Sequence, residues 1–564
     1  MEDSPYLQQH ETNPIQWMSW DHSTISKAKN QDKLIFLSIG YSTCHWCHVM
    51  NRECFSQQEV AESLLPFMCI KVDREACPDV DLFYITAASS IQGTAGWPCN
   101  LFLTSNLHPF YTFTYLPKPE LIELCNRVSN SDLREYESIG QSVYEATISL
   151  LSLSSPFASS LSSLCCTKEL DNAIRRYRAV FTGPRFVPFE LLRLCVYDGN
   201  PHGLSFCKDF VLNLISSGTY DQLGDGVFRY ATDLQWKVPH FEKMLYDQAQ
   251  LLLILALLYN HDQDSLLLNV IHRLISFLNR EMRLENGLYC CGVDAEDLTG
   301  CEGAFYQWTR AEVVEVLEVG GLDERTISEF LVLFTANEEM SNPFLTKLYS
   351  QLTDRENTLL GIGKNLLFKA RQDRLGCKRD EKCLLSWNSL LLWALAAVGK
   401  ATKNTQYIEQ ACQLAESLLS TFNVFDSPCH SFYHGKCSFD TTLEDLGYLL
   451  RGLVALINDV DDVVDLLDEC AQIRKIILAD FQAKDNEAIL FYNSKKSLIP
   501  RISKCSTKGN LPNPFLITVE ALVGLVNHGI GESTTVKKFL LAWYNEESCR
   551  ESFCCSIHKF IDLD

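Results

Sequence analysis

This sequence of 564 residues has fewer basic than acidic side chains. Its 49 Lys and Arg residues face 71 Asp and Glu residues, which gives a formal net charge of −22. Proteins that bind nucleic acid or anionic membranes present a basic face to their partner. The composition therefore argues against nucleic-acid and membrane partners and leaves neutral and cationic partners open.

Long hydrophobic runs and a leader segment are also missing. The longest apolar runs, at residues 251–259 and 390–398, reach about half the length of a membrane span. The N-terminus lacks the basic and apolar regions of a signal peptide, and its acidic start is untypical of a mitochondrial transit peptide. We expect a cytoplasmic protein, because a mitochondrial or secreted location would require a targeting segment upstream of residue 1.

Cysteine is abundant but is not arranged as a disulfide scaffold. The 24 cysteines are scattered along the chain, with adjacent pairs at residues 165–166, 290–291 and 554–555. This distribution differs from that of small secreted disulfide proteins and favours a reducing compartment. The length and the 46% hydrophobic content predict two or more domains with ample cores.

One pair of cysteines has the spacing of a redox motif. An apolar, β-rich run at residues 34–39 leads through a short turn into Cys44-His45-Trp46-Cys47, at the predicted start of a helix. Thiols at positions i and i+3 of a first helical turn can form a disulfide, and the helix N-terminus favours a thiolate at the first of them. Cys44 is therefore the candidate nucleophile and Cys47 its candidate resolving partner.

Three other interpretations of this motif stay open. With His48 it matches the Cys-x-x-Cys-His pattern of c-type haem attachment, although the preceding strand favours a thioredoxin-like turn. A zinc site would need a second ligand pair, and no second Cys-x-x-Cys follows, although His45 and His48 are close. The cysteines could also be an inert packing pair. Our prediction is a redox pair with no metal and no cofactor.

Strands and helices alternate around the motif. Strands are predicted at residues 34–39, 67–73, 100–104 and 110–115, and helices at 23–33, 44–64 and 79–91. This order implies parallel pairing. Pro98, after Trp97, directly precedes a strand, where thioredoxin-like folds carry a cis-proline, although an ordinary strand-entry proline would look the same. We assign residues 1–148 to an α/β thioredoxin-like domain with an N-terminal arm.

A serine-rich linker, residues 149–165, separates this domain from a helical remainder, residues 166–564. The remainder shows few convincing strands and about twelve to fourteen helical segments. They include residues 169–180, 207–217, 240–260, 264–283, 309–319, 385–401, 405–422, 443–458, 462–481, 514–527 and 535–545. Paired helices repeated about six times predict an all-α (α/α)6 toroid, and an irregular helical array is the alternative.

Two stretches of the helical part carry candidate chemistry. Pro239 suits the first position of a helix, and helical spacing would then place His240, Lys243, Asp247 and Gln250 in one polar stripe, either lining the toroid's mouth or facing solvent. A glycine-rich loop predicted at residues 292–305 carries several carboxylates, and sugar hydrolysis or proton abstraction requires a pair of them. Acidic loops are also common in so negative a chain. The loop carboxylates are Asp294, Glu296, Asp297 and Glu302.

Trp387 and Asn388 carry a weaker signal. Aromatic rings such as Trp387 stack on sugars but also pack between paired helices. Asn388 stands near a predicted helix start, where a side-chain cap is the simpler role.

The motifs taken together resemble one family. The matching stretches are SPYLQQH, NPIQW, FLSIGYSTCHWCHVM, IKVDRE, PDVD, GWP with FLT, YDQL, VPHFEKMLYDQAQLL, EGAFYQWT, SWN, LED and GNLPNP, from residue 4 to about residue 555. They look like the family of spermatogenesis-associated protein 20 and its bacterial relatives. The resemblance implies a thioredoxin-like domain followed by a six-hairpin, glycosidase-like toroid related in fold to N-acylglucosamine 2-epimerase. It also implies links to spermatogenesis and, by fold analogy, to carbohydrate metabolism.

The chain departs from the family pattern in ways that predict a divergent and somewhat shortened member. Phe228 stands where the family's Gly-Gly-Gly-Phe-His-Arg-Tyr has histidine, Glu296 replaces the second acid of Asp-Ala-Asp, and Ser389 replaces the glycine of Trp-Asn-Gly. The chain is shorter at residues 181–186 and 334–383. These changes favour the loss of any ancestral carbohydrate activity.

The strand before the motif lacks the buried acid that thioredoxins usually carry, because Ser38 stands at that position. Proton transfer from Cys47 would then use water or a histidine such as His48. A slow or specialised redox site is therefore favoured over a general disulfide reductase.

The leading hypothesis is a thiol–disulfide redox protein in which Cys44 attacks, Cys47 resolves, and the toroid recognises or presents the substrate. The partner would be a disulfide-bearing protein or a small carbohydrate. A carbohydrate-active toroid (epimerase, isomerase or glycosidase) and a non-enzymatic scaffold are the alternatives. The predicted substrate-binding residues are Trp97, Pro98, Arg229, Tyr230, His240, Asp247, Asp294, Glu302, Trp387 and Asn388.

Overall fold

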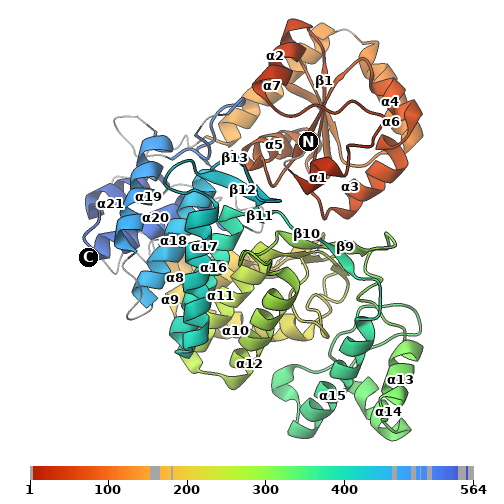
Figure 1. Cartoon of the computed structure of the whole chain (residues 1–564), viewed down its shortest axis with the longest axis vertical. Coiled ribbons are helices and arrows are strands. Elements are labelled where there is room, and N and C mark those ends of the chain that lie inside the picture. Colours follow the sequence, from red (N-terminus) through yellow and green to blue (C-terminus); the bar gives the residue numbers. More distant parts are fainter. Residues whose placement is uncertain are drawn as a thin grey trace.

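The structure, a computed structural model, describes residues 4–131, 133–152, 166–179, 182–459, 466–483, 491–495, 497–504, 511–543 and 554–556. An α/β domain lies at the top of Figure 1, and the helical part lies below it. Most of the predicted linker, residues 153–165, lies outside the described residues. No helix in the described part of the chain has the length and apolarity needed to cross a membrane.

Four strands form the sheet of the first domain: β1 (Ile35–Gly40), β2 (Met68–Asp73), β3 (Cys99–Leu103) and β4 (Pro109–Phe113). Their order is β2-β1-β3-β4, with β1 parallel to β2 and antiparallel to β3. Side chains alternate between the faces of a strand, so Leu37 packs in one apolar cluster and Phe36 in the other. Both faces of β1 are covered, which explains its run of apolar residues.

Helices cover both faces of this sheet. On the Leu37 face pack α2 (His22–Asn30), α5 (Pro78–Gln92) and α7 (Leu133–Leu150), and on the Phe36 face pack α4 (Gln58–Leu64) and α6 (Lys118–Ser129). In the N-terminal arm, α1 (Pro5–Gln8) contacts β2. The motif helix α3 (His45–Met50) continues into a π-helical turn, Asn51–Phe55.

The helical part contains an inner ring of nearly all-buried helices. α11 (Leu245–Asp262), α16 (Leu385–Thr402) and α20 (Pro514–Asn527) bury most of their side chains, as helices surrounded by protein do. Together with α9 (Phe189–Asp198) and α18 (Leu443–Asp459) they line a central hollow of about 450 Å³. Arg193 of α9 pairs with Glu520 of α20 at 2.9 Å and so joins the first of these helices to the last.

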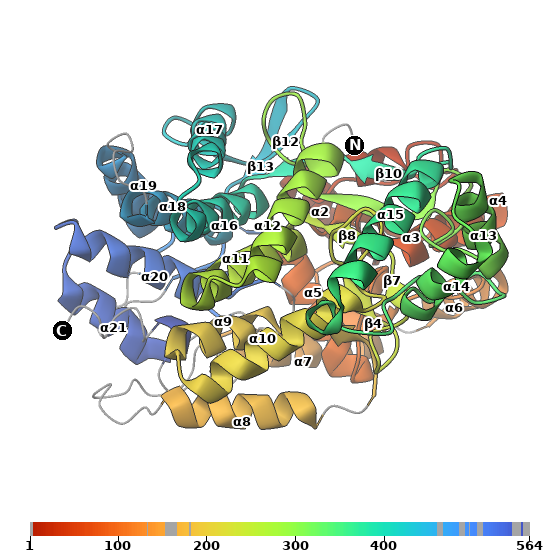
Figure 2. The same ribbon diagram turned by 90° about the horizontal axis from the view of Figure 1, so that it is seen from below.

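Outer helices alternate with the inner ones along the chain and pack around them (Figure 2). In α17 (Thr405–Thr421) the buried residues are Ala411, Leu414, Ala415 and Leu418, the spacing of a single helix face. The other outer helices are α8 (Cys166–Arg178), α10 (Pro201–Ser216), α12 (Ser265–Phe277), α19 (Leu467–Asp480) and α21 (Ser533–Trp543). The predicted fold class, a thioredoxin-like domain followed by an α/α toroid, is confirmed.

A smaller helical module interrupts the ring between α12 and α16. It comprises α13 (Arg310–Val319), α14 (Glu324–Leu333) and α15 (Asp354–Arg371), which share an apolar cluster of their own. A π-helical turn, Leu278–Met282, precedes it, and a short 3₁₀ helix, Tyr349–Gln351, lies within it. The module projects from the toroid at the lower right of Figure 1.

Three small sheets gather at the mouth of the toroid, where the sequence pattern predicted few strands. Their orders are β5-β6-β7, β10-β9-β8 and β11-β12-β13. The strands are β5 (Arg185–Phe186), β6 (Tyr230–Ala231), β7 (Pro239–His240), β8 (Lys243–Met244), β9 (Gly292–Asp297), β10 (Cys377–Asp380), β11 (Cys383–Leu384), β12 (Cys429–Tyr433) and β13 (Lys436–Asp440).

Two sequence predictions at this mouth are wrong. The helix predicted from residue 240 begins only at Leu245, and residues 292–297 form a strand rather than a loop. Both differences have one cause, since β9 pairs with β8 on one side and with β10 on the other. His240 and Lys243 therefore do not share a helix with Asp247 and Gln250, and the predicted polar stripe is not formed.

A buried ion cluster holds the two domains together. The ammonium of Lys382, with no exposed side-chain surface, contacts Asp73 at 2.8 Å, Glu75 at 2.9 Å and Asp380 at 3.3 Å. We call these four residues the anchor cluster. Beside it, His430 of β12 lies 2.6 Å from the backbone carbonyl of Glu75. The anchor cluster joins the end of β2 and the loop after it to the β10–β11 segment of the toroid.

Candidate functional site

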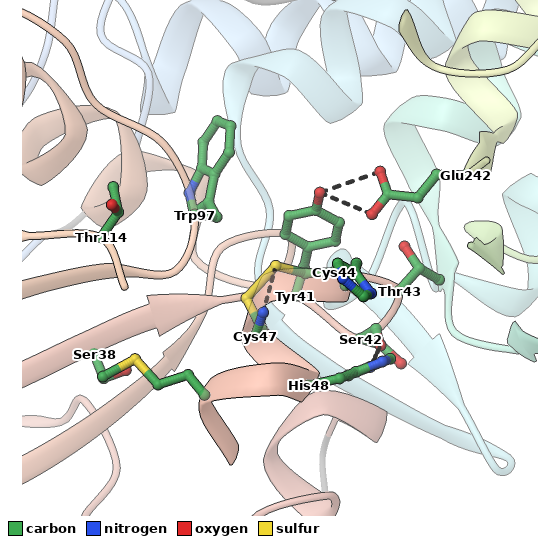
Figure 3. The surroundings of a disulfide bond; sticks show 12 residues. Ser38, Tyr41, Ser42, Thr43, Cys44, Cys47, His48, Trp97, Thr114 and Glu242 are labelled. Atoms are coloured by element: carbon green, nitrogen blue, oxygen red, sulfur yellow. Dashed lines mark hydrogen bonds between the residues drawn. A yellow bond between two sulfur atoms is a disulfide. The ribbon is translucent and has the colours of Figure 1, made fainter. Parts of the chain in front are cut away.

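The Cys44–Cys47 pair is oxidised in the structure and lies at the start of α3. The sulfurs are 2.26 Å apart, and the Cys47 backbone N–H donates to the Cys44 sulfur at 3.2 Å (Figure 3). Cys44 is the N-cap of α3, so its sulfur takes up a backbone donor that the helix itself leaves unpaired. Both cysteines are buried, with exposed fractions of 3% and 2%.

The segment opposite the disulfide carries the predicted proline. The Trp97–Pro98 peptide bond is cis, which confirms the thioredoxin-like alternative at this position. The Trp97 ring packs against the cluster that contains both cysteines, and its indole N–H donates to Asp81 at 2.7 Å. Trp97 is therefore held beside the disulfide.

The toroid covers the disulfide from the other side. The Tyr41 hydroxyl donates to Glu242 at 3.0 Å (Figure 3). The Thr43 hydroxyl lies 3.7 Å from the Met244 sulfur. Glu242 also accepts from Arg229 at 2.9 Å. The segment that links β7 and β8 therefore sits directly over the turn that precedes Cys44.

Histidines of the motif face carboxylates of β9. His45 Nδ1 lies 2.6 Å from Glu296, which also accepts from Arg52 at 2.8 Å, and His48 Nδ1 lies 3.4 Å from Glu296 and 3.7 Å from Asp294. We call these five residues the redox-side cluster. Burial lowers the pKa of His48, but its hydrogen bond to Glu296 and the charge of Asp294 outweigh burial, so the pKa is raised. Burial raises the pKa of Asp294 to about 7.

His240 connects the redox-side cluster to Glu242 through Glu302, which lies 3.6 Å from His45 Nε2. His240 Nδ1 lies 2.6 Å from Glu302, and its Nε2 lies 3.3 Å from Glu242. Burial disfavours the imidazolium, but the two carboxylates outweigh it and raise the pKa of His240 to about 9. In turn, His240 and Arg229 outweigh the burial of Glu242 and lower the pKa of that carboxyl to about 2. The site is thus a chain of alternating cations and carboxylates.

The structure brings most predicted binding residues to this mouth. Arg229, His240, Asp294 and Glu302 lie in the ionic chain just described, and the Tyr230 ring stacks on His240 with 4.8 Å between centroids. Asp247 is buried in the first turn of α11.

Trp387 and Asn388 of α16 lie deeper in the toroid. Trp387 meets Tyr246 edge-on at 4.7 Å. The Asn388 amide accepts from the backbone of Tyr289 at 2.8 Å and donates to it at 2.9 Å, so it ties the chain before β9 to α16. Phe228, in place of the family histidine, is fully buried among Phe241, Ala295 and Tyr306.

Three polar side chains lie behind the disulfide in the thioredoxin core. The Lys71 ammonium donates to Ser38 at 3.0 Å, and no carboxylate pairs with it among the described residues. Burial lowers the pKa of Lys71 well below its usual range. A Cβ on Gly40 would lie 2.2 Å from the Tyr6 hydroxyl and 2.8 Å from the Cys47 sulfur, so these two atoms are at most about 5 Å apart. Burial and the Asp73 charge raise the Tyr6 pKa, and Ser38 only partly offsets them.

Sequence reasoning did not assign a role to Tyr6, Lys71 or Glu242. Each stands within a motif that was noted, but a motif alone gives no contact. Lys71 carried one usable signal, because a lysine in the middle of an apolar strand is rarely buried without a special environment. The Cys429–Cys437 disulfide between β12 and β13 was also unforeseen.

The geometry bears on two other roles, that of His48 as a proton acceptor for Cys47 and that of a metal site. His48 Nε2 donates to the Ser42 carbonyl at 2.7 Å while Nδ1 faces the carboxylates, so neither nitrogen is left for Cys47. Within the described ranges, no group of three or more His, Cys, Asp or Glu side chains is arranged to hold a metal ion.

Comparisons with known proteins found one family model and several relatives. A family model described as Thioredox_DsbH, a protein of unknown function (DUF255), matches residues 1–147. Mouse and human spermatogenesis-associated protein 20 are 29% and 30% identical over 522 and 520 residues, covering 81% of this chain. An uncharacterised protein of Caenorhabditis elegans is 29% identical over 74% of this chain and 64% of its own length. The chain spans 66% of the length of the mouse and human relatives.

Solved structures similar to the chain include carbohydrate enzymes. Cellobiose 2-epimerase from Spirochaeta thermophila matches with a TM-score of 0.41 and 13% identity, over 68% of this chain and 88% of that one. A family 76 glycoside hydrolase from Bacteroides thetaiotaomicron matches with a TM-score of 0.34 and 13% identity, over 64% of this chain and 57% of that one.

Proposed function

We propose that the chain is a member of the family of spermatogenesis-associated protein 20 and a cytoplasmic thiol–disulfide redox protein whose toroid recognises the substrate. The observation that carries the proposal is the disulfide itself. It stands at the N-cap of α3, opposite Trp97 and the cis-proline, and beneath a polar face of the toroid.

The reaction follows the order of the two cysteines. In the reduced protein, the Cys44 thiolate attacks one sulfur of a substrate disulfide, forms a mixed disulfide and releases the other substrate sulfur as a thiol. The Cys47 thiolate then attacks the Cys44 sulfur, releases the second substrate thiol and forms the Cys44–Cys47 disulfide. Two electrons pass to the substrate, and a cellular dithiol or glutathione-type thiol returns them to the pair.

The side chains behind the pair supply a proton acceptor for Cys47. Lys71, which donates to Ser38 and whose pKa burial lowers well below its usual range, is the group to which we assign the proton that Cys47 loses before it attacks. The Tyr6 hydroxyl lies at most about 5 Å from the Cys47 sulfur. This amine takes the place of the carboxyl that thioredoxins carry, and it replaces His48, whose nitrogens are engaged elsewhere. General acid–base groups of this kind contribute when their pKa lies near the working pH.

The substrate reaches Cys44 through the contact between the domains. Because Cys44 is 3% exposed, a protein disulfide reaches it only when the Tyr41–Glu242 and His45–Glu296 contacts separate. The toroid face that then meets the substrate carries Glu242, Glu296 and Glu302, which favours an extended, cationic segment around the substrate disulfide. This requirement fits a specialised redox protein rather than a general reductase.

Differential alkylation in defined glutathione or dithiothreitol buffers tests the proposal. We expect one reversible two-electron transition at Cys44 and Cys47, within the thiol-oxidoreductase range of roughly −120 to −270 mV. Other thiols serve as internal references, because burial raises the pKa of Cys54 to about 11 and of Cys69 to about 12. Cys44→Ser abolishes exchange with a model disulfide, and Cys412→Ser, on the outer helix α17, leaves it unchanged. Unchanged exchange in Cys44→Ser would refute the proposal.

A carbohydrate-active toroid is the second candidate. It is favoured by one observation, the ionised Glu242 held by His240 beside Asp294, a carboxyl whose pKa is raised to about 7. Such a pair of unlike carboxyl groups suits acid–base work on a sugar. The test is calorimetric titration with mono- and disaccharides, in which His240→Ala should weaken binding and a panel without any binding would reject this function.

A further inference from the structure

A cavity of about 400 Å³ opens on the side of the toroid, between β8–β10, the π-helical turn and the end of α15, and neither Cys44 nor Cys47 lines it. Its wall contains five cationic side chains and only two acidic ones, Glu281 and Glu381. The cations are Lys243, Arg280, Arg371, Arg374 and Arg379. This is a local excess of positive charge in a chain with a net charge of −22. We call this cavity the basic pocket.

The carboxylates around the basic pocket do not neutralise it fully. Asp221 is shared, because it contacts Lys243 at 2.7 Å and Arg371 at 2.8 Å. Each of the other three arginines has a single carboxylate partner. The pairs are Arg280 with Glu281 at 2.7 Å, Arg374 with Glu312 at 3.1 Å and Arg379 with Glu381 at 2.6 Å. Among the described residues, five cations therefore share four carboxylates, which leaves an excess of one positive charge.

The innermost cations are buried, so an uncompensated positive charge among them is costly. Lys243 and Arg371 are 2% and 3% exposed, and the buried Nε of Arg371 has no hydrogen-bond partner among the described residues. Burial lowers the pKa of Lys243, and the nearby Arg371 adds to this effect, although Asp221 opposes it. An anion in the pocket would compensate both groups.

The cations are also held in fixed positions. The Arg371 guanidinium lies 5.0 Å from the Phe305 ring and 5.4 Å from the Tyr306 ring, and the Lys243 ammonium lies 4.9 Å from the Tyr306 ring. Gly224 permits this approach, because a Cβ there would lie 2.1 Å from Arg371 Nη2. The Gly224 carbonyl in turn accepts from Arg280 at 2.7 Å. The aromatic rings add an apolar wall next to the charges.

We propose that the basic pocket binds a phosphate monoester of a small, sugar-sized molecule. Planar guanidinium groups match the paired oxygens of a phosphate group, and a dianion satisfies the uncompensated charge. The volume suits a ligand of this size, and the rings of Phe305 and Tyr306 offer a surface for its uncharged body. The site is independent of the redox chemistry proposed for Cys44, although Lys243 directly follows Glu242, which contacts Tyr41.

The test is isothermal titration of the whole chain with glucose 6-phosphate, glucose and inorganic phosphate in separate experiments. We expect glucose 6-phosphate to bind, inorganic phosphate to bind more weakly and glucose not to bind, and we expect added salt to weaken binding. Arg280→Gln and Arg379→Gln change exposed side chains at the rim of the pocket, and each should weaken binding about tenfold. Arg355→Gln, on an exposed arginine of α15 outside the pocket, should bind like the wild type.

Three results would overturn the proposal. They are glucose binding as tightly as its phosphate, inorganic phosphate binding as tightly as glucose 6-phosphate, and wild-type affinity in both pocket variants. The Cys44→Ser protein should give the same titration as the wild type, so failure of the redox function and failure of this site are distinguishable.

Discussion

Two polar clusters join the thioredoxin-like domain to the toroid, and they differ in the cation that holds them. In the anchor cluster, Lys382 is fully buried and meets three carboxylates. Those carboxylates hold the pKa of Lys382 well above its usual range, although burial alone would lower it. The ammonium of Lys382 therefore keeps its charge at physiological pH, although burial raises the pKa of its partner Glu75 to about 7.

The redox-side cluster is built from weaker cations. His45 and His48 carry charge only when protonated, and the side chain of Arg52 is half exposed, so solvent screens its pair with Glu296. The difference between the two clusters indicates which contact between the domains can open. Separation beside Cys44 breaks titratable and screened contacts and one buried hydrogen bond, from Tyr41 to Glu242, whereas separation at Lys382 would expose a buried lysine and its carboxylates. We infer that the substrate enters on the redox side while the anchor cluster stays closed.

Removal of the anchor cation should have the largest effect. Lys382→Met leaves three buried carboxylates without their cation, and we expect the free energy of unfolding to fall by about 3–5 kcal/mol. Urea unfolding followed by circular dichroism measures it. Lys369→Met, on an exposed lysine of α15, is the control and should stay within about 0.5 kcal/mol of the wild type. Equal stability of the two variants would show that Lys382 does not stabilise the contact between the domains.

Glu296→Gln should loosen the redox side without unfolding the protein. It removes the charge that His45, His48 and Arg52 share, and we expect a loss of about 2 kcal/mol in the closed contact. Reduction of the Cys44–Cys47 disulfide by a phosphine should then become about tenfold faster or more. Glu329→Gln, whose partner Arg355 lies in the projecting module, is the matched control. An unchanged rate in Glu296→Gln would place the opening elsewhere.

The same contact should weaken as the pH rises. The folded-state pKa of His48 is raised, so its contribution is complete below its ordinary pKa of about 6.5 and is lost as the pH rises through the folded value. Asp294, with a pKa raised to about 7, also disfavours the closed form as it ionises. We expect phosphine reduction of the pair to accelerate several-fold between about pH 6 and 8.

Two comparisons make this pH effect specific. His48→Gln should flatten the profile, because it removes the histidine that bridges Glu296 and Asp294. The Cys429–Cys437 disulfide, which lies in the β12–β13 hairpin, is an internal reference and should show no such acceleration. Parallel profiles for the two disulfides would mean that the histidine does not control access.

The sequence predicted the parts of the fold that local pattern determines. The helix predicted at residues 514–527 is α20, and the strand predicted at residues 34–39 is β1 almost to the residue, because apolar periodicity and the Pro514 start are local signals. The start of α11 was missed because pairing of β8 with β9 overrides the helical propensity of residues 240–244. Short strands at a domain mouth depend on partners far away in the chain, which a local pattern does not contain.

The candidate site, too, was predictable only where it depends on residues that are contiguous in the chain. Cys44 and Cys47 were predictable, because the motif and its strand–turn–helix setting are contiguous. That the redox pair lies under Glu242 and beside Glu296 depends on contacts between residues about 200–250 positions apart. For the proton of Cys47 the sequence left open water or a histidine such as His48, whereas the structure places Lys71, Ser38 and Tyr6 behind the sulfur.

The smallest expected effect concerns this buried lysine. Its removal should raise the stability of the protein but lower the rate of its reaction. Lys71→Met removes an amine that is buried without a carboxylate partner among the described residues, so the free energy of unfolding should rise by about 1 kcal/mol. The same change should slow the step in which Cys47 resolves the mixed disulfide, measured in single-turnover reactions with a model disulfide. At high pH, the higher concentration of hydroxide replaces the missing base, so the rate of the variant should approach that of the wild type. Stabilisation with an unchanged rate at every pH would leave Lys71 a packing residue and return the proton of Cys47 to water.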